Sequence, residues 1–132
     1  MRRAILPIAV LLVGAAACSD DGPGSADEMP VATFEVAGQE TYKIALATLA
    51  LVEHARQLME GSEEGRIPVG RIVRDDPSVN APWSWHIDPA TLEFADVTTE
   101  VCDGLPSYVE DGTLTSDTYC PWSADVIAID GA

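Results

Sequence analysis

A histidine between a serine and an aspartate offers the residue types of a hydrolytic site in the stretch NAPWSWHIDP, residues 80–89. In an extended strand, side chains alternate between two faces, so Ser84, His86 and Asp88 would share one face. Residues two apart on a strand stand about 6.6 Å apart. A triad instead needs hydrogen-bond contact from nucleophile to base and from base to acid, and no G-x-S-x-G motif is present. The row therefore predicts a polar surface or a pocket wall.

The chain has three tryptophans that could stack against a ligand, and two of them lie in the same stretch. On an extended strand, Trp83 and Trp85 share the other face with Ile87, a pattern typical of a buried core. Trp122 lies in a segment rich in turn residues, which makes it the better candidate for stacking. We therefore expect the first two tryptophans in the core and the third on the surface.

Metal ligands are sparse in the sequence. The two histidines, His54 and His86, match no zinc-ligand spacing, and His54 lies beside the apolar stripe of an expected helix. Calcium is the open alternative because aspartates lie in expected turns, although no D-x-[DN]-x-[DN]-G loop occurs. These aspartates are Asp75, Asp76, Asp103, Asp111 and Asp117. We expect no metal site and no cofactor.

The first segment, MRRAILPIAVLLVGAAAC, has the layout of a lipoprotein signal peptide over residues 1–17. A cationic start precedes an apolar run, and small residues lead to Cys18. The apolar run is shorter than the roughly 20 residues that span a bilayer. The run GAAAC resembles the lipobox of bacterial lipoproteins, in which the cysteine after the cut becomes lipid-modified, although Ala15 stands where leucine is usual. A plain secretory signal cut after residues 15–17 is the alternative.

The three cysteines bear on this choice, because an odd number in an exported protein needs an explanation. Lipid on Cys18 leaves Cys102 and Cys120 as a pair, which we expect to form a structural disulfide in an oxidising compartment. Ser19 follows Cys18, so an aspartate retention signal for the inner membrane is absent. We therefore expect a lipid anchor in the cell envelope, at the outer membrane or the cell surface.

Acidic residues dominate the rest of the chain. Without residues 1–17, the chain has 22 acidic and 5 basic residues, a formal charge of −17. Such a surface opposes nucleic-acid binding, which needs lysine and arginine to neutralise phosphates. The charge favours solubility, or alternatively attraction for cations or basic partners. Residues 18–30 are acidic and contain glycine and proline, which predicts a flexible tether. Residues 31–132 are long enough for one globular domain.

The hydrophobic pattern predicts one helix among several strands. Apolar residues at helical spacing over residues 49–61 indicate a helix, with Thr48 as its N-cap. Alternating patterns predict strands at residues 31–36, 41–46, 69–74, 83–87, 97–102 and 124–129. The first two form a hairpin. The fold class is therefore α+β, an antiparallel sheet of about five strands with one helix packed on a face and one disulfide.

Three stretches, GRIVRDDPSVNAPWSWHIDP, EVCDGLPSYVE and YCPWSADV, resemble a small exported bacterial domain that is similar to the amino-terminal domain of a slime-mould calmodulin-binding protein. The resemblance covers residues 31–130, with WSWH and CDG-x-PS-x-VE as its specific motifs. It implies a shared fold and no catalytic residues. Calmodulin binding does not transfer, because the expected helix has one basic residue, Arg56, whereas calmodulin targets are basic amphipathic helices.

Two classes of function fit these observations. The first is a membrane-anchored lipoprotein with a small non-enzymatic domain that binds a protein or a small ligand; a protease-inhibitor role for the loop of residues 103–119 is a variant. The second is a small hydrolase or other enzyme with a polar pocket around His86, using Asp88 with Glu100 or Asp103. We favour the first. Candidate binding residues are Ser84, His86, Asp88, Glu100, Asp103 and Trp122.

Overall fold

The computed structural model describes residues 28–131 and shows an α+β domain whose strands form two antiparallel sheets. The predicted class and the antiparallel pairing are confirmed. The single sheet of about five strands is wrong, because one sheet has three strands and the other has four. The predictions for residues 1–27, the signal peptide and most of the tether, lie outside the described residues.

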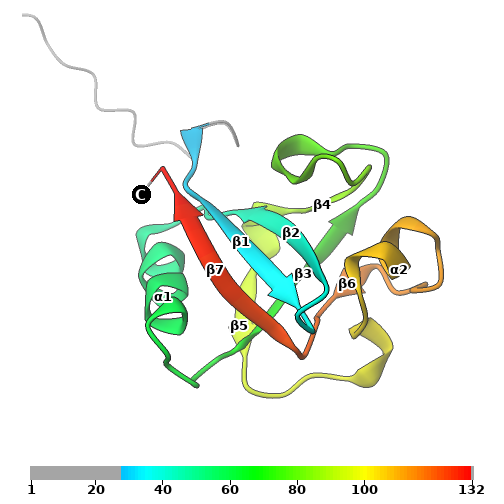
Figure 1. The fold of residues 1–132 in the computed structure, drawn as a ribbon. Coiled ribbons are helices and arrows are strands. Elements are labelled where there is room, and N and C mark those ends of the chain that lie inside the picture. Colours follow the sequence, from blue (N-terminus) through cyan, green and yellow to red (C-terminus); the bar gives the residue numbers. More distant parts are fainter. Residues whose placement is uncertain (1–27, 132) are drawn as a thin grey trace, which may run out of the picture.

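The three-stranded sheet contains the predicted hairpin. Its strands are β1 (Val31–Val36), β2 (Glu40–Ala45) and β7 (Ala124–Asp130), in the order β2-β1-β7 (Figure 1). Ala37 and Gly38 connect β1 to β2 with φ angles of 52° and 65°. Two consecutive positive φ angles are typical of the type I′ turn, whose twist matches that of the two strands.

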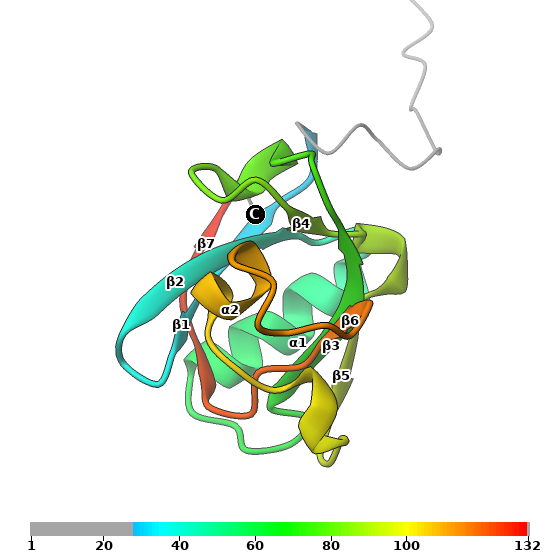
Figure 2. The same ribbon diagram turned by 90° about the vertical axis from the view of Figure 1, so that its right-hand side faces the viewer.

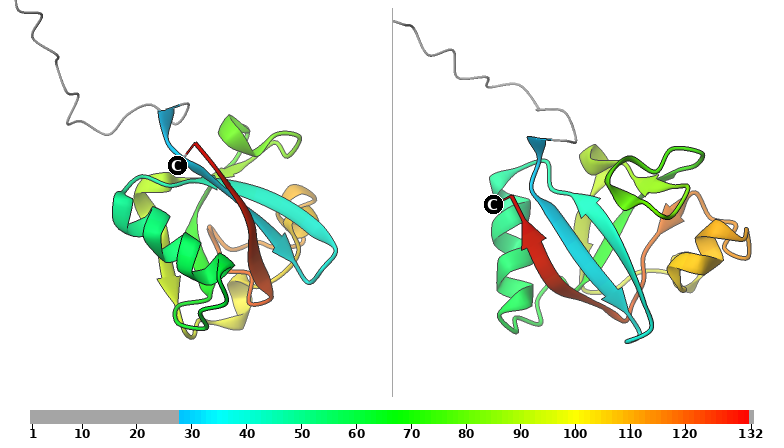
Figure 3. Two further views of the ribbon diagram at one scale, coloured as in Figure 1. Left: turned by 60° about the vertical axis from the view of Figure 1, so that its left-hand side comes forward. Right: turned by 45° about the horizontal axis from the view of Figure 1, so that its top comes forward.

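Helix α1 (Leu49–Met59) lies beside β7 and closes one side of the core (Figures 1 and 3). Thr48 is the N-cap, as predicted: its side-chain oxygen accepts a hydrogen bond from the backbone N–H of Leu51 at 3.1 Å. Val52 and Ala55 are buried on the inner face of the helix. Capping and apolar spacing together account for this element.

The second sheet is built around β3 (Ile67–Val73). This strand pairs with three short ones: β4 (His86–Ile87), β5 (Glu93–Ala95) and β6 (Thr118–Tyr119). The predicted strand that contains both tryptophans therefore has only two residues in a ladder. Turns precede β4, and Pro89, which has no N–H to donate, begins a 3-10 turn just after it.

The strand predicted at residues 97–102 is wrong, because its last three residues form a 3-10 turn, η4 (Glu100–Cys102). The carbonyl of Cys102 accepts a hydrogen bond from the backbone N–H of Cys120 at 2.7 Å. The two side chains form a disulfide with Cα atoms 5.0 Å apart, so the predicted pairing is confirmed. The β-branched residues of this segment alternate as in a strand, but the turn and the disulfide determine its backbone.

A short helix that the sequence analysis missed, α2 (Pro106–Glu110), lies on the side of the domain opposite α1 (Figure 2). Pro106 is in its first turn, where the missing N–H costs nothing. The backbone N–H and the hydroxyl of Ser107 donate to the two carboxylate oxygens of Glu40, each at 2.8 Å. A residue of β2 therefore caps this helix from a distant part of the sequence.

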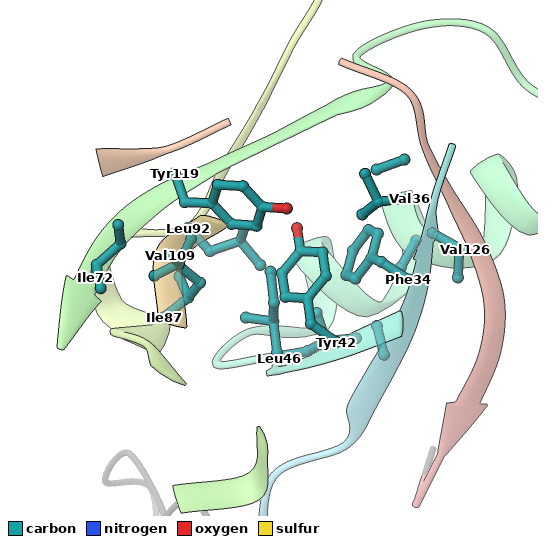
Figure 4. Packing of buried hydrophobic residues seen from close by; sticks show 14 of the residues in the cluster. Phe34, Val36, Tyr42, Leu46, Ile72, Ile87, Leu92, Val109, Tyr119 and Val126 are labelled. Carbon is teal, nitrogen blue, oxygen red and sulfur yellow. The ribbon is translucent and has the colours of Figure 1, made fainter. Parts of the chain in front are cut away.

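The core lies between the two sheets, and Figure 4 shows Phe34 of the first sheet opposite Ile87 of the second, with the rings of Tyr42 and Tyr119 between them. The two tyrosine ring centroids are 5.1 Å apart. Burial raises the pKa of both phenols. Trp85 is 1% exposed and Ile87 is 2% exposed, which confirms that this side of the WSWH stretch faces the core.

Buried side chains fasten the segment before β4 to the outer edge of β2. The amide oxygen of Asn80 accepts from the backbone N–H of Lys43 at 2.7 Å, and its Nδ2 donates to the carbonyl of Trp85 at 2.9 Å. Trp83 is half-buried and donates its indole N–H to the carbonyl of Thr41 at 2.8 Å. Side chains thus cover this edge of β2, and the second sheet does not continue the first.

The two ends of the described chain lie together, far from Trp122. Val31 is opposite Asp130 at one end of β1, and Val36 is opposite Ala124 at the other end. The six residues of β1 span about 17 Å. Figures 1 and 2 accordingly place the start of β1 (blue) at the top of the domain and η4 (yellow) near the bottom. The chain enters and leaves at one end, and the connection from β6 to β7 turns at the other.

Candidate functional site

The structure does not connect Ser84 with His86. The backbone N–H and the hydroxyl of Ser84 donate to Glu110 Oε2 at 3.1 and 2.9 Å. His86 Nδ1 donates to the backbone carbonyl of Asp76 at 2.6 Å. No hydrogen bond within residues 28–131 joins the serine to the histidine, so the arrangement lacks the contact between nucleophile and base that a triad uses.

Asp88 is engaged with a neighbouring strand. Its Oδ2 atom accepts from the guanidinium of Arg71 at 2.7 Å, and its Oδ1 atom accepts from the backbone N–H of Ala90 at 3.0 Å. The hydrogen bond from Arg71, followed by that from Ala90, lowers the pKa of the Asp88 carboxyl. The aspartate stabilises the turn after β4 and does not contact His86 through a hydrogen bond.

A small cavity of about 150 Å³ lies beside Ser84, and His86 does not line it. The guanidinium of Arg74, on its wall, donates to the carbonyls of Val109 and Leu114 at 3.0 and 3.3 Å. Pockets that bind small ligands have volumes of roughly 300–1,000 Å³. This cavity is smaller than that range, and its arginine already holds the loop around α2.

The remaining predicted residues lie at the other end of the domain. Glu100 and Asp103 flank Cys102 on η4, whereas β4 with His86 lies near the upper end in Figures 1 and 2. The structure therefore brings Asp103 close to Trp122 and does not bring either acidic residue to His86. The enzyme pocket that would combine these residues is not assembled within the described part of the chain.

Trp122 is firmly attached to the segment that contains η4. Its backbone N–H donates to Asp103 Oδ1 at 2.8 Å, and its indole N–H donates to Thr98 Oγ1 at 2.7 Å. The Cys102–Cys120 disulfide joins the same two segments. Despite these contacts, the tryptophan side chain is 41% exposed. Its orientation is therefore fixed while part of its surface remains open to solvent.

Two exposed valines lie on the same segment as the contacts of Trp122. Val97 is 83% exposed, and Val101, on η4, is 74% exposed. Val97 and Trp122 line one shallow cavity of about 110 Å³, with Ile67 on its floor. We call Val97, Val101 and Trp122 the tryptophan patch. The sequence analysis missed both valines, because the alternating pattern suggested a strand; their position beside a disulfide cysteine was the one available signal.

Carboxylates flank the tryptophan patch. Asp96 lines the cavity, and Glu100 and Asp103 lie on either side of Val101; all three are at least partly exposed. The ion pairs among residues 28–131 are Arg56–Glu53, Arg66–Asp125 and Arg71–Asp88. None of them includes a carboxylate beside the tryptophan patch. No lysine or arginine follows Arg74 in the sequence, so this end of the domain is acidic.

A larger hollow of about 400 Å³ lies at the opposite end of the domain, between the start of α1 and the two chain ends. Leu49, Pro30 and Gly131 are among its lining residues, and Leu49 is 87% exposed. It lies where residues 28–30 enter the fold. This position separates it from the tryptophan patch by the length of β1.

Within the described residues, no three His, Cys, Asp or Glu side chains are placed to hold a metal ion. His54 Nε2 donates to the carbonyl of Gly65 at 2.9 Å, and its ring stacks on Phe94 with centroids 4.4 Å apart. No helix of residues 28–131 has both the length and the apolar character needed to cross a membrane.

The chain belongs to the BP-74 N-terminal domain family, whose family model matches residues 29–131. The match confirms the resemblance that the WSWH and CDG-x-PS-x-VE motifs indicated. Comparison with curated proteins and with solved structures finds no match.

Proposed function

We propose that this chain is an exported lipoprotein, anchored in the cell envelope through lipid on Cys18, whose domain is a non-enzymatic binding module. The signal-like segment before Cys18 supports the export step. The disulfide supports the anchor, because it accounts for Cys102 and Cys120 and leaves the cysteine of the GAAAC run as the third. We place the protein at the outer membrane or the cell surface.

The observation that carries the binding role is the tryptophan patch. Large apolar side chains are exposed there on a segment that a disulfide and the hydrogen bonds of Trp122 hold in place. Exposed apolar patches with polar rims are typical of interaction sites. A surface that is ordered before binding loses less conformational entropy when a partner docks. The patch lies at the end of the domain away from residues 28–30, so an anchored protein would present it outward.

Membrane fractionation tests the anchor. We expect the parent protein in the membrane fraction and the Cys18→Ala variant in the soluble fraction, with the disulfide intact in both. If the variant stays with the membrane as the parent does, the lipid anchor is wrong.

Photocrosslinking tests the binding role without assuming a partner. A benzophenone amino acid replaces Val101 in one variant and Leu49 in a matched control, since both side chains are highly exposed but lie at opposite ends. We expect irradiation of cells that produce the protein to give a discrete adduct from position 101 and none from position 49. Equal labelling at both positions, or labelling at 49 alone, would contradict the proposed binding surface.

A further inference from the structure

The chemistry of the tryptophan patch indicates which partner it accepts. Its apolar surface consists of an indole ring and two valines, and its charged neighbours are all carboxylates. These are Asp96, Glu100 and Asp103. Because none of them is in an ion pair within residues 28–131, their charges are available to a partner. An indole face next to free carboxylates attracts a cation by its ring quadrupole and by Coulomb interaction.

The same end of the domain repels anionic partners. Acidic residues continue to the end of the sequence after Arg74, whereas basic residues do not. A negative patch gains affinity, and above all association rate, from a positive partner and disfavours a negative one. Charge complementarity therefore specifies a basic partner, and it opposes binding of the patch to a second copy of the same acidic surface.

The apolar part of the patch excludes a simple cation as the whole ligand. The cavity between Val97 and Trp122 has a volume of about 110 Å³, which suits one side chain and is too small for a typical small-molecule ligand. Val101 adds a further apolar surface on η4. A polypeptide segment can supply both an apolar side chain for the cavity and a charged one for the carboxylates.

We infer that the tryptophan patch binds a cationic segment of a partner polypeptide, with an Arg or Lys side chain against the Trp122 ring and a neighbouring apolar side chain in the Val97–Trp122 cavity. Glu100 and Asp103 pair with further basic residues of the segment. This inference rests on the proposed binding function and specifies the class of its partner.

Fluorescence anisotropy with defined peptides tests the inference on the purified protein. The probe is a fluorescein-labelled peptide with a repeating Arg-Leu-Ser unit, at about 150 mM salt so that only short-range charge effects remain. We expect saturable binding. A Glu-Leu-Ser peptide should not bind, and an Arg-Ser-Ser peptide should bind at least about tenfold more weakly, because the cavity then receives no apolar side chain.

Variants locate the binding. We expect Trp122→Ala to raise the dissociation constant by about tenfold or more, as for an aromatic hot spot. Val97→Ser serves as a second variant, because this exposed side chain makes no hydrogen bond that folding could need. Glu100→Gln should weaken binding by about two- to fivefold and reduce its dependence on salt. The controls are Leu49→Ser and Glu60→Gln, which change the same kinds of exposed residue on α1 and at its C-cap.

Each outcome decides the matter. Loss of affinity in the patch variants and unchanged affinity in the controls supports the inference. Equal weakening by Glu60→Gln and Glu100→Gln would mean diffuse charge attraction and would overturn it. Tighter binding of the anionic peptide, or self-association that Val97→Ser abolishes, would also overturn it. If position 101 crosslinks in cells but no cationic peptide binds, the binding function stands and the assigned partner class is wrong.

Discussion

Removing the Cys102–Cys120 disulfide should destabilise the domain by about 3 kcal/mol. The two cysteines are 18 residues apart in the sequence. In the chain-entropy model, a crosslink that closes a loop of this size lowers the entropy of the unfolded chain by an amount worth about 3 kcal/mol at 25 °C. Whole domains are stable by roughly 5–15 kcal/mol. The double variant Cys102→Ala/Cys120→Ala should therefore fold, but with much reduced stability.

Urea unfolding measures this effect. With a slope of about 1–3 kcal/mol per M, the midpoint should fall by roughly 1–3 M while the slope stays similar. Cys18→Ala is the matched control, because it removes a cysteine without touching the bond, and its midpoint should not move. A loss below about 1 kcal/mol, or free thiols at both positions in exported parent protein, would refute the reasoning. Peptide binding should weaken in the same double variant, because Trp122 loses one of its attachments to η4.

Three further predictions concern the core. Trp85→Ala should cost about 3–5 kcal/mol because it empties a buried aromatic site, whereas His86→Ala should cost about 0.5–1.5 kcal/mol for one partly exposed hydrogen bond; urea unfolding would show similar losses if the assigned faces are wrong. Asn80→Ala should cost about 1–3 kcal/mol because two backbone groups lose their partner, and an unchanged midpoint would refute that role. Burial raises the pKa of Tyr42 and Tyr119, so the stability tied to their neutral phenols is complete below the unfolded-state value of about 10 and falls as pH rises above it. Absorbance titration should show two of the three phenols ionising together with unfolding, and their ionisation in the folded protein would contradict the burial.

Local signals were sufficient for the parts of the fold that depend on neighbouring residues. Thr48 and the apolar spacing after it located α1, and the alternation around Gly38 located the hairpin. The parity of the cysteines led to the correct disulfide. These features are encoded within a few residues, or in a count.

The features that were missed depend on contacts between distant segments. The side chain that caps α2 is Glu40, 67 residues before Ser107, so no local pattern announces it. Asn80 looks like an ordinary turn residue until its partner at Lys43 is known. The exposure of Val101 depends on which element fails to cover it, and its alternation with neighbours suggested a strand instead. Trp122 was expected at the surface and lies there, whereas its role in binding remains a prediction.

The most direct test of the account follows the three indole N–H signals by NMR during titration with the Arg-Leu-Ser peptide. The three indoles have different environments: Trp122 donates to Thr98, Trp83 donates to Thr41, and Trp85 is buried without a hydrogen-bond partner among residues 28–131. Trp122→Phe assigns the signal at the patch. The account predicts that the Trp122 signal moves in a saturable way while the other two stay in place. Saturable shifts at Trp83 or Trp85 with a stationary Trp122 signal would contradict the assignment of the tryptophan patch as the binding surface.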